Sequence, residues 1–198
     1  MKNVNKTLVK IAVISMLVAI SYVLFLLEFP VIPAFSHLKL DFSDIPALIG
    51  GLIFGPVSAV IIELLKNALE LLTKGMGTQM GFGNIMNFIV GCAYVVPFCL
   101  AYKPLSKSNK TMAIGVSGVI GIVSIILFGI LGNYFIDPPF FRHFLGVEVT
   151  DEALWSAIWA ATAINAIKGV MLTVLGFPII YALLSKLRKI VKRFTESV

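Results

Sequence analysis

Six apolar runs, separated by polar or glycine- and proline-rich segments, make up most of this chain. They cover residues 8–27, 44–54, 57–73, 84–102, 112–135 and 154–187. A helix rises 1.5 Å per residue, so about 20 apolar residues cross the roughly 30 Å hydrocarbon layer. The second run is short, and the last is too long for one upright span. We therefore expect an all-α integral membrane protein with six transmembrane helices, forming a single membrane domain over residues 1–198.

The first run looks like a signal peptide, because lysines precede it. It is, however, about 20 residues long, enough to span a bilayer. No pattern of small residues typical of a cleavage site ends it. We expect an uncleaved first helix.

Basic residues gather in three clusters: before the first run, between the fourth and fifth runs, and after the sixth. Their members are Lys2, Lys6, Lys10, Lys103, Lys107, Lys110, Lys186, Arg188, Lys189, Lys192 and Arg193. Positively charged loops tend to stay in the cytoplasm, so an even number of spans should separate each cluster from the next. Six helices satisfy this condition. The pattern predicts that both termini are cytoplasmic and that the loops after the first, third and fifth helices face outside.

Composition supports a membrane protein and excludes several other classes. Hydrophobic residues make up 59% and charged residues 13%, against about 25% charged in soluble domains. The net charge of +6 comes largely from clusters beside apolar runs, which favours the lipid bilayer over nucleic acid as the partner. Neither the histidines nor Cys92 and Cys99 have metal-site spacing, so no metal is expected. The chain has no P-loop motif for ATP.

Polar residues that a bilayer disfavours concentrate toward the predicted outer side. Asn87 lies early in the fourth helix, Asn133 late in the fifth, and Asn165 and Lys168 in the outer half of the sixth, while Asp41 precedes the second. We expect these groups to converge on one outward-opening cavity. A charged residue in an apolar segment costs roughly 2.5–3.5 kcal/mol, so Lys168 needs a ligand or a partner. Asn165, three positions earlier, favours a ligand; the alternatives are snorkelling to water or a structural carboxylate.

A second polar stripe lies on the third helix, where Glu63, Lys66, Asn67 and Glu70 share one face. In one interpretation, Lys66 can pair with either carboxylate and the stripe is a structural ion network. In the other, the carboxylates form a proton or ion relay. We favour the structural interpretation, because the positive partner is already present.

Several segments resemble the riboflavin-specific substrate-binding subunit, or S component, of energy-coupling factor (ECF) transporters. The segments are Glu28–Pro30, Leu38–Gly51, Phe54–Pro56, Glu63–Asn67, Asn87–Gly91 and Asn165 with Lys168 and Gly169. The resemblance implies a multi-pass protein of the bacterial cell membrane that captures riboflavin from outside. It also implies a partner ECF module of one transmembrane coupling protein and two ATPases, with no chemistry on the substrate and no cofactor.

The resemblance also assigns residues. Asn133, Asn165 and Lys168 are similar to groups that hydrogen-bond the ligand, and Leu40 and Asp41 to part of a lid, here the outer loop 28–43. A flat flavin ring also needs apolar walls; the candidates are Phe35, Phe42, Phe82, Tyr134 and Phe135. Docking on the coupling protein would use Ser15 and Ala19, where the family usually has two alanines. The alternative function is a proton-coupled secondary transporter that works through Glu63 and Glu70.

Overall fold

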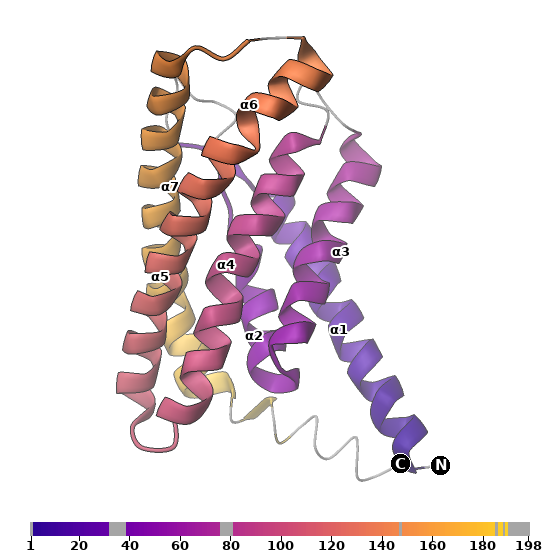
Figure 1. The fold of residues 1–198 in the computed structure, drawn as a ribbon. Coiled ribbons are helices and arrows are strands. Elements are labelled where there is room, and N and C mark those ends of the chain that lie inside the picture. The colour runs from indigo at the N-terminus through magenta and orange to yellow at the C-terminus, as the bar shows by residue number, and fades with distance from the viewer. Residues whose placement is uncertain are drawn as a thin grey trace.

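The structure, a computed structural model, is a bundle of helices (Figure 1). It describes residues 2–31, 39–75, 81–146 and 148–184, together with residues 186, 187 and 189. Within this part of the chain, six helices have eleven residues or more. They are α1 (Lys2–Leu26), α2 (Asp44–Phe54), α3 (Pro56–Lys74), α4 (Phe82–Leu105), α5 (Lys110–Phe135) and α7 (Asp151–Pro178). All six fall on the predicted apolar runs.

Successive helices run in opposite directions along the bundle. In Figure 1, the start of α1, the connection between α4 and α5, and the end of α7 lie at the lower end. The short helix α6 (Asp137–Phe140) lies at the opposite end, which we call the α6 end. The first basic cluster and the one between α4 and α5 therefore lie at the same end of the bundle. Most of the last cluster lies outside the described residues.

Local sequence signals explain where the helices begin and end. Gly55 separates α2 from α3 with a φ of 99°, a backbone conformation that side chains other than glycine disfavour. Pro56 follows as the first residue of α3, where its missing N–H group is not needed. Asn109 and Thr150 cap α5 and α7 by accepting hydrogen bonds from the backbone N–H groups of Met112 and Ala153.

The outer surface of the bundle suits a bilayer. Among the described residues, four helical stretches are long and apolar enough to cross a membrane: 6–26, 82–105, 110–144 and 151–182. Large apolar side chains such as Val119 and Trp159 are exposed, as expected for lipid contact. Tyr94, Phe98 and Leu172 are fully buried in the interior of the bundle. The structure agrees with an all-helical membrane protein; α2 is apolar but only 11 residues long.

Two loops contain structure that the sequence did not predict. The segment between the fifth and sixth apolar runs, where the sequence predicts no helix, holds α6 and a π-helical turn at Phe141–Leu145. Pro138 and Pro139 do not prevent this helix, because proline is tolerated in a first helical turn. The predicted lid contains a short antiparallel hairpin, in which β1 (Phe29–Pro30) pairs with β2 (Lys39–Leu40). Residues 32–38 of the lid lie outside the described residues.

The last helix also differs from the predicted 154–187. It begins at Asp151, three residues earlier than expected. The π-helical turn Ile179–Leu183 follows it, directly after Pro178. Proline removes one backbone donor from a helix, and such a change of helical type is a common response.

A candidate ligand-binding site at the α6 end

A cavity of about 710 Å³ lies at the α6 end of the bundle. Its wall includes the end of α3, the starts of α4 and α7, and α6. Its apolar lining comprises Phe25, Phe82, Met86, Val90, Phe141, Leu154 and Ile164, among others. The volume falls in the range of small-molecule sites, which combine mostly apolar walls with a few placed polar groups.

Four of the six ligand-binding residues expected from the sequence line this cavity. Asn87 comes from α4, Asn133 from α5, and Asn165 and Lys168 from α7. The other two, Leu40 and Asp41, are buried beside it, with exposed fractions of 4% and 1%. Asp41 reaches the cavity indirectly, because its carboxylate accepts a hydrogen bond from Lys168.

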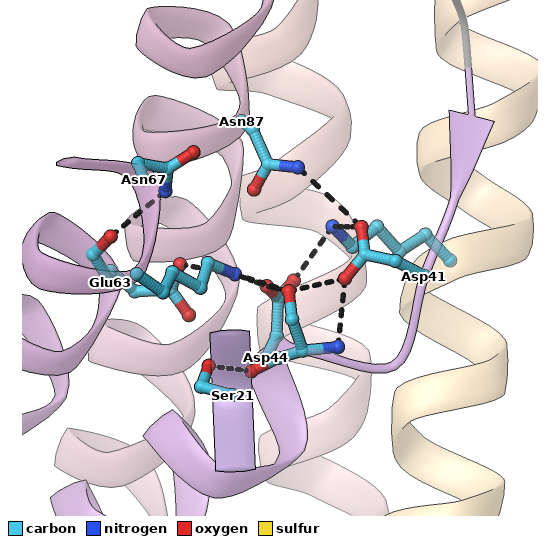
Figure 2. A network of polar contacts seen from close by, with 9 residues as sticks. Ser21, Asp41, Asp44, Glu63, Asn67 and Asn87 are labelled. Atoms are coloured by element: carbon cyan, nitrogen blue, oxygen red, sulfur yellow. Dashed lines mark hydrogen bonds and ion pairs between the residues drawn. The ribbon is translucent and has the colours of Figure 1, made fainter. Parts of the chain in front are cut away.

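Beneath the cavity, five charged side chains form what we call the buried ion cluster (Figure 2). Its members are Asp41, Asp44, Glu63, Lys66 and Lys168, all nearly or wholly buried. The Lys168 ammonium lies 3.2 Å from Asp41 Oδ2 and 3.0 Å from Asp44 Oδ2. Lys66 pairs with the other oxygen of the Asp44 carboxylate, Oδ1. The Lys66 ammonium also lies 2.7 Å from Glu63 Oε2. Asp44 therefore joins the two lysines.

The cluster connects three separate parts of the fold. Asp41 and Asp44 flank Ser43 where the hairpin leads into α2, Glu63 and Lys66 share a face of α3, and Lys168 comes from α7. Ser43 supports both halves, because its backbone N–H group donates to Asp41 Oδ1 over 2.7 Å and its hydroxyl accepts from Lys66 over 2.7 Å. Buried charges are tolerated only when paired in this way. The cluster thus fixes the inner end of the predicted lid against α3 and α7.

Asp41 stays ionised in this setting. Burial by itself would raise the pKa of Asp41, but the Lys168 and Lys66 ammonium groups and the hydrogen bonds from Ser43 outweigh burial. The pKa of Asp41 is therefore lower than the usual 3.8. Asp41 remains a negative partner for Lys168 throughout the physiological range.

The sequence favours a ligand as the partner of Lys168, with a structural carboxylate as one alternative. The structure shows that carboxylates do pair with Lys168. The two arrangements are compatible, because an ammonium has three N–H donors. Two carboxylates, Asp41 and Asp44, are in ion-pair range. Lys168 also lines the cavity, so a further donor is available to a ligand.

The polar stripe of α3 forms ion pairs within the helix and with other elements. Lys66 pairs with Glu63 as predicted. Of the two carboxylates it could reach, Lys66 does not use Glu70, which lies 3.0 Å from Lys74 and accepts a hydrogen bond from Asn84. The second partner of Lys66 is Asp44, which comes from another element. Helical spacing shows which groups share a face, but not which groups of neighbouring helices approach it.

A second ion network lies where the cavity meets the hairpin. Glu28 Oε1 accepts from Lys39 over 2.7 Å and from Lys74 over 3.0 Å, and Lys74 also pairs with Glu70. All four residues line the cavity, and sequence reasoning did not assign them to the site. The side chains of Lys39 and Lys74 are 39% and 40% exposed. These ion pairs therefore stabilise the fold only modestly, since exposed ion pairs contribute about 0–1 kcal/mol.

The aromatic walls were only partly anticipated. Phe82 lines the cavity as expected, but Phe42, Tyr134 and Phe135 do not; Phe35 lies outside the described residues. The remaining aromatic lining comes from Phe25 of α1 and from Phe141. The rings of Phe82 and Phe141 lie 5.6 Å apart. The sequence gives no helical signal between the fifth and sixth apolar runs, so it does not indicate that Phe141 faces the cavity.

The two expected docking residues lie elsewhere. Ser15 and Ala19 are both exposed on α1, one helical turn apart and outside the cavity lining. Two small residues at this spacing leave a shallow strip on which another helix can pack closely. The geometry is compatible with docking, and their role stays a prediction.

A membrane-embedded helical bundle with a ligand-sized cavity at one end is typical of a substrate-binding membrane protein. Comparison with known families agrees. The sequence model of the family described as "ECF transporter, substrate-specific component" matches residues 9–181, and the chain belongs to this family. The resemblance inferred from the sequence is confirmed. The chain is accordingly a transport subunit of a bacterial membrane, with several membrane-spanning helices.

Individual relatives point the same way. The chain is 35% identical over 167 residues to the riboflavin transporter FmnP of Bacillus subtilis (strain 168), covering 83% of this chain and 86% of the relative. It is 32% identical over 186 residues to the riboflavin transporter RibU of Staphylococcus aureus (strain TCH60), covering 93% of each. Its fold is similar to a solved S component of a bacterial ECF transporter, with a TM-score of 0.71, 27% identity and coverage of 90% and 97%.

Proposed function

We propose that this chain captures riboflavin with high affinity from outside the cell and delivers it to an ATP-driven ECF module. The observation that carries the proposal is the composition of the cavity. Asn87, Asn133, Asn165 and Lys168 enter it from three helices, between walls that include Phe82 and Phe141. Riboflavin needs this combination, because its ring is flat and apolar while its pyrimidine-like edge and its polyol chain are polar. The names of the relatives support the same ligand.

The proposed topology places the α6 end outside. Six helices would then cross the membrane and both termini would be cytoplasmic, as the positive-inside rule requires. In support, the first basic cluster and the one between α4 and α5 share the opposite end. The loop 28–43 would act as a lid whose inner end is held by Asp41 and Asp44. Riboflavin would reach the cavity from outside when this lid moves.

The proposed partners supply the energy. A coupling protein and two ATPases would bind this subunit, with Ser15 and Ala19 on the docking face of α1. The family description supports this assembly, because a substrate-specific component works within a larger transporter. The exposed position of both residues on α1 also supports it. Riboflavin would be the transported ligand and not a resident cofactor.

The test is a binding titration with purified protein in detergent. We expect a yellow preparation when the protein is expressed with riboflavin, and quenching of flavin fluorescence when riboflavin is added to protein stripped of ligand. Binding should be saturable at a one-to-one ratio without sodium or a proton gradient. A colourless protein without flavin affinity would refute the proposal. Binding that required sodium or tracked pH steeply would instead favour the secondary transporter.

A further inference from the structure

Asp137 is a carboxyl group in the cavity to which neither the sequence analysis nor the comparisons assign a role. It is the first residue of α6, is 7% exposed and lines the cavity. Its Oδ1 atom is buried, and no donor in the described part of the chain bonds to it. A buried polar atom without a hydrogen-bond partner is unfavourable. Such a group in a binding cavity suggests that a ligand supplies the missing donor.

The other ion-forming groups around the cavity are already paired. Lys168 is held by Asp41 and Asp44, and Glu28, Lys39, Glu70 and Lys74 pair with one another. Asp137 has no ion pair among the described residues within 4.0 Å. Among the described acidic side chains that line the cavity, Asp137 is therefore the one with an oxygen free to accept a hydrogen bond from a ligand.

The polar groups of the cavity differ in whether they can donate or accept hydrogen bonds. Lys168 offers only donors, and Asn165 offers both a donor and an acceptor. The carboxyl group of Asp137 offers acceptor oxygens, and no donor in the described part of the chain uses its Oδ1 atom. The two residues sharing α7 match the pyrimidine-like edge of a flavin, where one N–H group lies between two carbonyl groups. The free acceptor at α6 matches the ribityl chain, whose four hydroxyl groups can donate hydrogen bonds.

We propose that Asp137 is a specificity-determining residue that accepts hydrogen bonds from the hydroxyl groups of the ribityl chain. This inference rests on the proposed function and adds an orientation to it: the flavin ring edge lies toward Lys168 and the polyol toward α6. Asn133 supports the assignment, because it lines the cavity four positions before Asp137, at the end of α5. A polyol chain would thus meet two polar groups on one side of the cavity.

The test compares riboflavin with lumiflavin, which has the same ring but a methyl group in place of the ribityl chain. Both are titrated into wild-type protein and into the Asp137→Ala, Asp137→Asn and Glu148→Ala variants by fluorescence quenching. Glu148 is the control, because its carboxyl is on the connection after α6 but its side chain is 83% exposed. Hydrogen bonds to charged groups contribute about 1.5–3 kcal/mol, so Asp137→Ala should weaken riboflavin binding roughly ten- to a hundredfold.

Lumiflavin affinity should be unchanged in Asp137→Ala. If Asp137 had only a structural role, its replacement would weaken the binding of both flavins. The riboflavin affinity of Asp137→Asn should lie between those of wild type and Asp137→Ala, because an amide keeps one acceptor oxygen but cannot carry a negative charge. It also provides the comparison if the alanine variant does not fold. An equal loss for both flavins, or no loss for either, would overturn the inference. If wild-type protein bound neither flavin, the proposed function itself would fail.

Discussion

The ammonium of Lys168 lies 3.2 Å from the carboxylate of Asp41, across 127 positions of sequence. This contact joins the wall of the cavity on α7 to the inner end of the hairpin segment. Asp44 extends the link to Lys66 on α3. A ligand that bonds to Lys168 would therefore stabilise the position of the segment that leads into α2. Binding and closure of the lid would share one group of charges.

Replacement of Lys168 by alanine should weaken riboflavin binding roughly ten- to a hundredfold, because it removes a charged donor worth about 1.5–3 kcal/mol from a desolvated site. Fluorescence titration in detergent measures the change. Lys103→Ala is the matched control, since Lys103 is exposed near the end of α4, at the opposite end of the bundle. Unchanged affinity in Lys168→Ala would show that the cavity is not the riboflavin site.

Lys66 should matter for stability more than for ligand contact. Lys66→Met leaves Asp44 and Glu63 buried without their shared cation, and breaking a buried ion pair typically costs 3–5 kcal/mol. The apparent melting temperature in detergent should fall clearly. Glu63→Gln should lower it less, because Lys66 keeps Asp44 and Ser43 as partners.

Glu63→Gln also tests the alternative function. Glu63 is buried against α4, where a Cβ atom added at Gly91 would lie 2.5 Å from its Oε2, and it does not line the cavity. We therefore expect Glu63→Gln to retain riboflavin affinity. Loss of binding in this variant, with Lys168→Ala unaffected, would support a relay through α3 and contradict our site.

The helices and the polar side of the bundle were predictable because both follow from short stretches of sequence. Apolar runs of bilayer length mark helices, and alternation of direction then places Asn87, Asn133 and Lys168 near one end. The link from Lys168 to Asp44 was not predictable in this way. It depends on how the segment before α2 packs against α7, and no local spacing records that packing.

Similar reasons explain the other errors. Glu28 and Lys74 meet because the end of α1 lies beside the end of α3, which neither segment indicates alone. Tyr134 and Phe135 were expected as walls from their place near the end of α5, but helical rotation decides which side chains face inward. They are 45% and 65% exposed, whereas Asn133, one position earlier, lines the cavity.

Gly129→Ala should reduce riboflavin affinity by displacing Asn165. A Cβ atom at this position would contact the Asn165 amide directly, and overpacking of this kind typically costs 1–3 kcal/mol. We expect about a tenfold loss of affinity in a fluorescence titration. Gly115→Ala, on the same helix with nothing within 4 Å of the added Cβ, should bind like wild type. Equal behaviour of the two variants would place Asn165 outside the site.

Acidification should remove the contribution of Asp41 to stability. The pKa of Asp41 is lowered in the folded protein from 3.8, so its ionised form stabilises the fold above that pH, and this stabilisation is lost as pH falls below it. The difference in melting temperature between wild type and Asp41→Asn should be constant from about pH 8 to pH 5. It should narrow below pH 3.8. A difference that already narrows near pH 6 would contradict the pairing of Asp41 with Lys168.

Ala19→Leu should weaken assembly with the coupling protein and leave riboflavin binding intact. Ala19 is exposed on α1 and outside the cavity lining, and a larger side chain there prevents the close helix approach that small residues allow. Co-purification with the coupling protein and ATPases measures assembly, and uptake into vesicles containing all subunits measures transport. Val119→Leu on the exposed face of α5 is the control. Riboflavin uptake by this chain alone, without the ATPases, would contradict both the docking surface and the proposed mode of transport.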